Sequence, residues 1–305
     1  MTPEQIIRDL KSDRVKKVIH DGDFCAEIDD QYALAYCIGS DKIDLLAVNA
    51  TAYYARSSAP NTEEVMLKSY REIYRVYDAL GITDKTYPAF EGARTRITVN
   101  ENFAPSVSPA AKNIVETVKN SDEVIYVIVT GPCSNVVSAC LMEPSIMDKL
   151  CVIWLGGNCI IKDLHFFEWN LNSDYAAAQL LLNMNIPLVM LPCKPNGSEK
   201  IVMDHTDFEK IHGDSKGAEF FRKTLPFQVT TPEQYATWKK VMCDLMGPAA
   251  IAVPEAINFS IIPAPVICDD EQYAIDSTRR KIIYGIDPNS EMIVADAIAA
   301  INKIV

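Results

Sequence analysis

Five carboxylates crowd into ten residues near the N-terminus: Asp21, Asp23, Glu27, Asp29 and Asp30. Packing so many negative charges together is unfavourable unless they share a positive partner. A hard divalent cation with oxygen ligands, Ca²⁺ or Mg²⁺, is the simplest partner. A solvated loop with a helix-capping aspartate is the plainer alternative, but a cap alone leaves Asp21 and Asp23 unexplained.

The residues on either side indicate what positions this cluster. Residues 15–20 read as a strand, and residues 31–38 read as a helix. In an open α/β sheet, the junction between a strand and its following helix is where ligands bind.

Thr130-Gly131-Pro132 repeats this arrangement, because it ends an apolar run and precedes a helical stretch. The carbonyl oxygen of Thr130 is a suitable ligand for a hard cation. The alternative is an ordinary strand–turn–helix unit in which Ser134 or Asn135 caps the helix.

Two further segments carry candidate site residues. Glu168 and Asn170 flank Trp169, which suits a sugar pocket with hydrogen-bonding groups and an apolar wall, whereas we interpret Asp174 as a helix cap. Asn158, after the Gly156-Gly157 turn, is a further candidate for substrate binding.

Asp244 is a single acid within the largely apolar residues 238–252. A buried carboxylate there needs a partner, and a metal shared with Asp23 and Asp30 would supply one.

Short apolar runs alternate with longer amphipathic stretches along the chain, which predicts an α/β fold. We expect one domain over residues 1–305, with an open, mostly parallel, Rossmann-like sheet, helices on both faces and the active site at the carboxyl ends of the strands. The predicted strands are residues 15–20, 43–50, 124–130, 150–155, 186–191 and 281–284, and the predicted helices are residues 31–38, 62–80, 108–120, 135–142 and 173–183. Two segments interrupt the alternation, residues 194–234 and the extended stretch 262–265 leading to Asp269-Asp270, and we interpret both as excursions near the mouth of a site.

Composition narrows the functional classes. The chain has 49% hydrophobic residues and a net charge of −12, which disfavours a nucleic-acid binder or an anionic membrane surface as partner. Nine cysteines without CxxC spacing indicate reduced thiols, and no secretory signal or membrane-spanning run is visible. We therefore expect a cytoplasmic protein that acts on a small molecule.

Taken in order, these motifs resemble the inosine-uridine-preferring nucleoside hydrolase family. The resemblance covers roughly residues 15–255 and matches a DxDxGxEIDD variant of the N-terminal motif, with Cys25 in place of the glycine. It further includes the TGP turn at Thr130, the Gly156-Gly157 turn and the Glu168-Trp169-Asn170 segment. In an ungapped alignment Gly247, rather than Asp244, stands at the position of the family's C-terminal aspartate.

The resemblance implies hydrolysis of the N-glycosidic bond of ribonucleosides to ribose and a free base. It implies Ca²⁺, rather than Mg²⁺, held by Asp23, Asp30, the carbonyl of Thr130 and Asp244, with Asp23 also deprotonating the attacking water. Asp29, Glu168 and Asn170 would bind the ribose. A homodimer or homotetramer is expected from the family alone.

Two alternatives remain at this point. A member of the fold that binds a nucleoside or sugar without cleaving it would carry most of the same residues. Asp21-Gly22-Asp23 also resembles the start of haloacid-dehalogenase-like phosphatases, although Cys25 then replaces a Thr or Val and the Asp29-Asp30 pair has no role.

Overall fold

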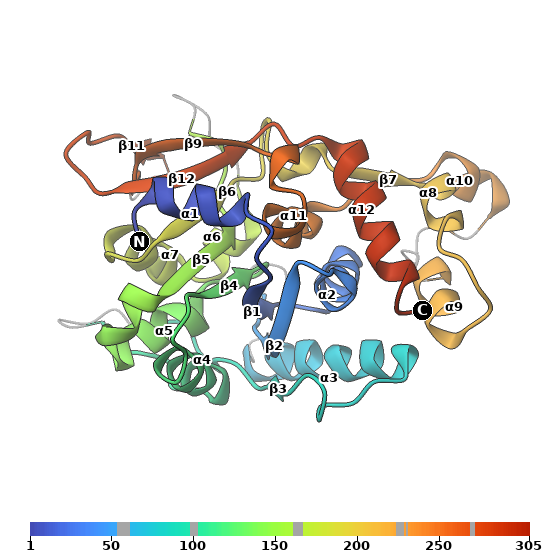
Figure 1. Ribbon diagram of the computed structural model, residues 1–305, viewed down its shortest axis with the longest axis horizontal. Helices are drawn as coiled ribbons and strands as arrows, with labels where there is room; N and C mark the ends of the chain where they lie inside the picture. Colours follow the sequence, from blue (N-terminus) through green and yellow to red (C-terminus); the bar gives the residue numbers. More distant parts are fainter. Residues whose placement is uncertain (54–61, 98–102, 161–166, 224–228, 230, 269–271) are drawn as a thin grey trace.

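The computed structural model describes residues 1–53, 62–97, 103–160, 167–223, 229, 231–268 and 272–305. A central sheet has the strand order β3-β2-β1-β4-β5-β6-β12-β9, and its neighbouring strands are parallel except for the β12–β9 pair. This confirms the predicted α/β fold with a mostly parallel sheet (Figure 1). The strands are β1 (Lys16–Gly22), β2 (Ile43–Ala50), β3 (Ala89–Phe90), β4 (Ile125–Val129), β5 (Leu150–Leu155), β6 (Leu188–Leu191), β9 (Asn258–Pro263) and β12 (Lys281–Ile286).

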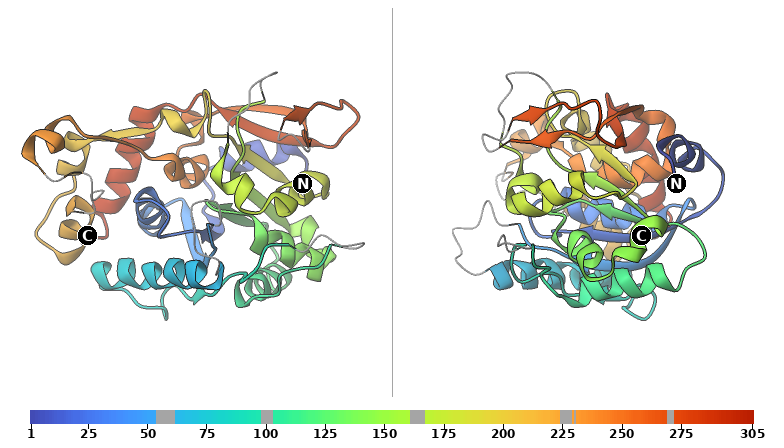
Figure 2. Two further views of the ribbon diagram at one scale, coloured as in Figure 1. Left: turned by 180° about the vertical axis from the view of Figure 1, so that it is seen from behind. Right: turned by 90° about the vertical axis from the view of Figure 1, so that its left-hand side faces the viewer.

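Helices cover both faces of the sheet, as Figures 1 and 2 show. Each face has its own hydrophobic core, and the strands between the two cores are almost wholly apolar because both of their faces are buried. One face carries α1 (Pro3–Leu10), α2 (Asp29–Gly39), α3 (Thr62–Leu80), α11 (Met246–Ala252) and α12 (Ser290–Asn302); the other carries α4 (Pro109–Lys119), α5 (Ser134–Met142) and α7 (Tyr175–Asn183).

Local sequence signals explain where several helices begin and end. The Ser108 side chain accepts a hydrogen bond from the amide of Ala111 and caps α4. Asp174 does the same for α7 through the amide of Ala177, which agrees with its interpretation as a cap. Gly81 follows α3 with a φ of 68°, a conformation that glycine adopts without strain.

The strand order creates a crevice between β1 and β4. From β1 the chain proceeds outward to β2 and β3, whereas β4 begins the other half of the sheet on the opposite side of β1. The loops that follow these two strands therefore diverge and leave room between them, which is the usual ligand position in open α/β sheets. The loop after β1 contains Asp23, and the loop after β4 contains Thr130.

Two expectations about the irregular segments need correction. Residues 258–263 form the edge strand β9, antiparallel to β12, rather than an excursion near a site mouth. Pro263 lies opposite Lys281 at the end of this edge strand, where its missing amide hydrogen costs little. Asp269 and Asp270 lie outside the described residues.

The described part of residues 194–234 contains regular elements that its polar composition did not predict. They contain β7 (Val202–Asp204), α8 (His205–Glu209), α9 (Lys216–Lys223) and the start of α10 (Pro232–Thr237), and β7 pairs with β8 (Lys239–Val241). The three helices gather at one end of the molecule, near the C-terminus (Figure 1). Within the residues described, no helix is long and apolar enough to cross a bilayer.

Candidate active site

A cavity of about 350 Å³ opens at the carboxyl ends of the central strands. It brings together residues from seven separate parts of the chain. Every candidate site residue predicted from the sequence lines it except Asn158: Asp23, Asp29, Asp30, Thr130, Glu168, Trp169, Asn170 and Asp244.

The loop between β1 and α2 holds its aspartates by turning sharply around a buried anchor. The Phe24 ring is fully buried and packs edge-on against His20, with ring centroids 5.1 Å apart. The amide of Ala26 donates to the carbonyl of Asp23 at 2.8 Å, and the amide of Glu27 donates to Asp30 Oδ2 at 3.2 Å. With Phe24 directed into the core, Asp23 and Asp30 face the cavity.

Three aspartates come together at the floor of the cavity: Asp23, Asp30 and Asp244. Asp30 lies close enough to Asp23 and Asp244 for their negative charges to raise its pKa. Burial raises the pKa of Asp23 to about 7 and raises the pKa values of Asp30 and Asp244 well above their ordinary range. The neighbouring negative charges act in the same direction on Asp30. Burial and mutual repulsion therefore both disfavour a full set of negative charges in this group.

The donor set fits a hard divalent cation. Asp29 Oδ1 and Asp30 Oδ1 are buried and have no hydrogen-bond partner, which is costly unless something else satisfies them. The carboxylate and carbonyl oxygens around this cluster are of the type that suits Ca²⁺ or Mg²⁺. Across the described ranges, however, no group of three or more His, Cys, Asp or Glu side chains is arranged to hold a metal ion, so the ligand set stays a prediction.

The turn after β4 places Thr130 beside this cluster. The amide of Thr130 donates to the carbonyl of Asp21 at 2.9 Å, and its hydroxyl lies 3.1 Å from His20 Nε2. Its carbonyl accepts a long hydrogen bond of 3.4 Å from Asn170 Nδ2. Neither Ser134 nor Asn135 caps α5, since Cys133 occupies the cap position. The alternative prediction that Ser134 or Asn135 caps this helix is therefore wrong.

Three backbone amides hold the carboxylate of Glu168 in place. Oε2 accepts hydrogen bonds from the amides of Gly157 at 2.6 Å and Leu171 at 2.8 Å, and Oε1 accepts from the amide of Asn170 at 3.0 Å. Glu168 thus caps α6 (Trp169–Ser173) while its side chain lines the cavity. These three amides oppose the effect of burial, which nevertheless raises the pKa of Glu168.

An aromatic pair stands at the rim. Trp169 is 39% exposed and packs edge-on against Phe167, with ring centroids 4.8 Å apart. Trp238 packs on Phe208 with ring centroids 4.9 Å apart and does not line the cavity.

The structure shows which of Asp244 and Gly247 can offer a side chain to the cavity. Asp244 reaches the cavity from the short 3-10 helix η3 (Cys243–Leu245), and its amide donates to Asp29 Oδ2 at 3.3 Å. Gly247 lies in α11 against β4, where an added Cβ would come within 2.8 Å of Ile128. A side chain at position 247 therefore has no space, whereas Asp244 faces the cluster.

Asn158 lies behind the cavity wall. Its Oδ1 accepts a hydrogen bond from the amide of Lys194 at 3.0 Å, and its own amide donates to the Tyr273 hydroxyl at 3.2 Å. A role in substrate binding stays a prediction for this residue.

Lys240 is a cavity residue that sequence reasoning missed. It lies in β8, and its Nζ is 3.0 Å from Glu27 and 3.8 Å from Asp29. Burial alone would lower the pKa of Lys240, but the two carboxylates raise it above its ordinary value. No local sequence motif marks this lysine. It reaches the site only because β8 pairs with β7.

Asp21 belongs to a layer behind the cavity rather than to its wall. It is fully buried at the end of β1 and accepts hydrogen bonds from Asn135 Nδ2 at 3.1 Å and Asn49 Nδ2 at 3.4 Å. Burial raises the pKa of Asp21 to about 8. It therefore ties β1 to β2 and α5 beneath the site.

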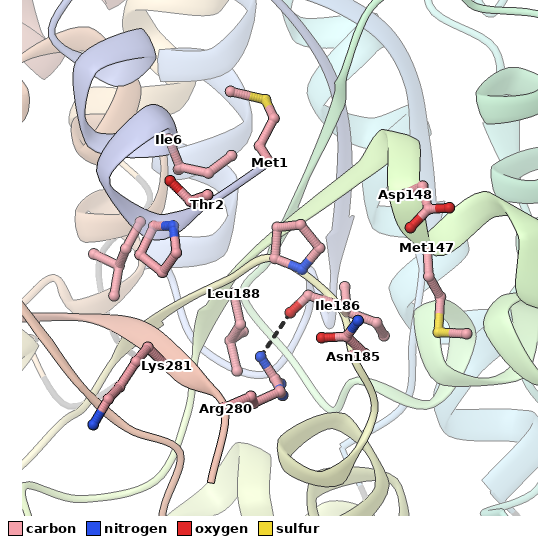
Figure 3. Close-up of a pocket in the computed structure, with 13 residues that line it drawn as sticks. Met1, Thr2, Ile6, Met147, Asp148, Asn185, Ile186, Leu188, Arg280 and Lys281 are labelled. Carbon is pink, nitrogen blue, oxygen red and sulfur yellow. Dashed lines mark hydrogen bonds between the residues drawn. The ribbon is translucent and has the colours of Figure 1, made fainter. Parts of the chain in front are cut away.

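A second cavity, of about 250 Å³, lies at the opposite edge of the sheet beside the N-terminus (Figure 3). Its partly buried Arg280 donates from Nη1 to the carbonyl of Ile186 at 2.8 Å and from Nη2 to the carbonyl of Leu181 at 2.8 Å. These bonds tie β12 to the end of α7, which indicates a structural role and leaves the acidic cavity as the candidate site.

Comparison with known proteins agrees with this geometry. The family described as inosine-uridine preferring nucleoside hydrolase matches residues 18–295. The chain belongs to this family. The match spans the acidic loop, the Thr130 turn and Asp244, and it decides against the phosphatase interpretation of Asp21-Gly22-Asp23.

Individual relatives are distant. The pyrimidine-specific ribonucleoside hydrolase RihA of Escherichia coli is 23% identical over 201 residues, covering 59% of this chain and 61% of that protein. RihB of Shigella flexneri is 33% identical over 129 residues, or 41% of each chain. This chain thus matches less than two thirds of the length of these curated relatives.

Solved structures share the fold over nearly the whole chain. A purine-preferring ribonucleoside hydrolase from Gardnerella vaginalis has a TM-score of 0.75 at 16% identity, covering 95% of this chain and 99% of that one. An inosine-uridine preferring nucleoside hydrolase from Bacillus anthracis has a TM-score of 0.66 at 17% identity, covering 95% and 100%.

Proposed function

We propose that this protein is a Ca²⁺-dependent ribonucleoside hydrolase that releases ribose and a free base. The main support is one observation: carboxylates from the β1–α2 loop and from η3 meet the Thr130 turn in a single cavity, opposite Glu168, Asn170 and Trp169. Family membership supports the same reaction class.

We assign the cation to Asp23, Asp30, the carbonyl of Thr130 and Asp244. When bound there, it would neutralise the buried carboxylates and make a water molecule easier to deprotonate. Mg²⁺ is the weaker candidate, because it demands stricter octahedral geometry than this flexible oxygen set supplies.

The protein's own residues account for the remaining steps. Asp23 has its pKa near neutrality and acts as the general base toward the attacking water. Asp29 Oδ1 lacks a hydrogen-bond partner and is free to accept one from a ribose hydroxyl. Asn170 and Glu168 hold the other side of the sugar.

Charge complementarity lowers the barrier to cleavage. Breaking the N-glycosidic bond leaves positive charge on the ribosyl carbon, and the surrounding carboxylates stabilise that charge. Trp169 and Phe167 provide an apolar wall for the departing base. The relatives are named for different bases, so we propose ribonucleosides as the substrate class without a preferred base.

The alternative is a protein that binds nucleosides without cleaving them. One observation favours it: none of the histidines in the described part of the chain lines the cavity, so no imidazole there is available to protonate a leaving base.

A panel of ribonucleosides tests both candidates. Ribose release that disappears after thorough chelation and returns with Ca²⁺ supports the hydrolase. Calorimetric binding of nucleosides with no turnover of any of them supports the binder. Cleavage that persists without any divalent cation contradicts our proposal.

Two broader properties complete the proposal. Nine cysteines, all present as free thiols, suit the reducing cytoplasm. We also propose a homodimer or homotetramer on the strength of family resemblance, which light scattering coupled to gel filtration would check by giving a multiple of 33.9 kDa.

A further inference from the structure

Two cysteines from distant parts of the chain meet on the wall of the candidate site. Cys193 follows β6, and Cys243 begins η3, immediately before Asp244. Their Sγ atoms are 3.9 Å apart. Both residues line the cavity, and both are partly exposed, so a small reagent in the cavity can reach them.

Backbone hydrogen bonds hold the two cysteines opposite each other. The amide of Cys193 donates to the carbonyl of Gly157 at 2.8 Å, which fixes it to the turn after β5. The amide of Met242 donates to the carbonyl of Ile201 at 2.8 Å and fixes the other side. A disulfide has an S–S length of about 2.05 Å, so the sulfurs would have to approach by roughly 1.9 Å.

The two thiols are chemically unequal. The two sulfurs lie within hydrogen-bond distance, and either can be the donor. The interaction with Cys243 lowers the pKa of Cys193. The thiolate is the reactive form of cysteine, so Cys193 is the better initial nucleophile.

We propose that Cys193 and Cys243 form a dithiol that hydroperoxides oxidise to a disulfide, and that this oxidation switches off the site. In the first step the Cys193 sulfur attacks hydrogen peroxide, which forms a sulfenic acid and releases one water molecule. In the second, the Cys243 sulfur attacks the sulfenic acid, which forms the S–S bond and releases a second water molecule. The two thiols lose two electrons and two protons, and the peroxide is reduced to two water molecules.

The expected effect on activity rests on the proposed hydrolase function. Pulling Cys243 toward β6 moves η3, which contains Asp244, and Asp244 in turn donates its amide to Asp29. Misplacing catalytic groups by about 1 Å can cost about 100-fold in rate. Oxidation should therefore lower both the hydrolysis rate and the affinity for Ca²⁺.

The disulfide can be detected without any activity measurement. Reduced protein is treated with hydrogen peroxide, alkylated and digested with trypsin under non-reducing conditions. Residues 163–200 contain Cys193 as their single cysteine, and residues 241–279 contain Cys243 and Cys268. The Cys268→Ser variant leaves Cys243 alone in the second peptide, so a linked species in this variant must join Cys193 to Cys243.

We expect the linked peptide in both the wild type and Cys268→Ser. Ribose release should fall by about 10- to 100-fold and return with dithiothreitol. Calorimetry should show weaker Ca²⁺ binding by the oxidised protein. Peroxide should change neither the rate of ribose release nor the Ca²⁺ affinity of Cys193→Ser, each compared with the untreated variant.

Other results would overturn the proposal. It fails if peroxide consumes thiols without producing the linked peptide, or if Cys193→Ser is inactivated as fast as the wild type. It also fails if the disulfide forms but changes neither ribose release nor Ca²⁺ affinity. If the wild type cleaves no nucleoside, the hydrolase function fails separately, and the peptide map with the Ca²⁺ titration still decides the switch.

Discussion

Asp23 has the position that the proposed general base requires. It lies directly after β1, faces the cavity and is 4% exposed, and burial raises its pKa to about 7. Catalysis by a base is most effective when its pKa lies near the working pH.

Replacing this carboxylate tests the assignment. Asp23→Asn should lower kcat by about 100- to 10,000-fold, the usual range for loss of a general base. The measurement is ribose release at saturating Ca²⁺, with the melting temperature as a check on folding. Asp13→Asn, on the exposed surface, serves as the control and should keep the parental rate. An Asp23→Asn rate within a few-fold of the wild type would exclude Asp23 as the base.

His20 links the site to the acid stability of the protein. Its ring is fully buried, and burial lowers its pKa to about 3 from an ordinary 6.5. Between these two pH values the unfolded chain binds a proton that the folded protein does not bind. This residue therefore contributes stability above about pH 6.5, and the contribution disappears as the pH falls toward 3.

A pH series isolates this effect. As the pH falls from 6.5, the free energy of unfolding of the wild type should decrease relative to that of His20→Gln, by at most about 1.4 kcal/mol per pH unit. Chemical denaturation of both proteins measures this difference in the free energy of unfolding. The buried aspartates have the opposite effect on stability, but both proteins contain them, so their effect cancels in the difference. Parallel curves for the two proteins would contradict the assigned pKa of His20.

At the scale of elements, the turn after β4 has no spare volume. A Cβ on Gly131 would come within 2.6 Å of Thr51 Cγ2 and 3.1 Å of Asp23 Oδ1. The absence of a side chain at this position lets the β1 and β4 loops approach each other.

Gly131→Ala should therefore displace Asp23, with a loss of kcat of about 100-fold and weaker Ca²⁺ binding. Ribose release and calorimetry measure the two effects. Gly81→Ala is the matched control, because its Cβ would meet nothing within 4 Å although its φ is positive. That control should lose about 1 kcal/mol of stability and keep its activity; equal losses of activity in both variants would show that general destabilisation is the cause.

Elements with local signals were predictable from the sequence, and elements defined by distant partners were not. Asp23 and Asp30 belong to one short motif, and Thr130 follows a recognisable buried strand. Pro263 obscured the edge strand β9, because proline usually argues against a strand. Lys240 had no local signal at all, since its place depends on β8 pairing with β7. The contact between Cys193 and Cys243 spans 50 residues and was equally invisible.

At the scale of the whole molecule, one sheet joins strands from β1, near the start of the chain, to β12, near its end. We propose on this basis that residues 1–305 form one domain. The cavity lies where both halves of the sheet contribute loops, so binding a cation there should stabilise the whole fold.

Removing the metal tests that coupling. Dialysis against a chelator should abolish ribose release and lower the melting temperature, and Ca²⁺ should restore both more effectively than Mg²⁺. At a free concentration of 100 times its Kd, Ca²⁺ should add about 2.7 kcal/mol to the free energy of unfolding. Calorimetry and thermal melting provide the measurements, and a melting temperature that ignores Ca²⁺ would contradict a cation site in this cavity.

The order in which the chain is synthesised gives the position of Asp244 a further consequence. Asp23 and Asp30 leave the ribosome well before Asp244, which lies 214 residues after Asp30. The proposed set of cation ligands is therefore incomplete until Asp244 has been made. We expect the protein to bind its cation only after that point in synthesis.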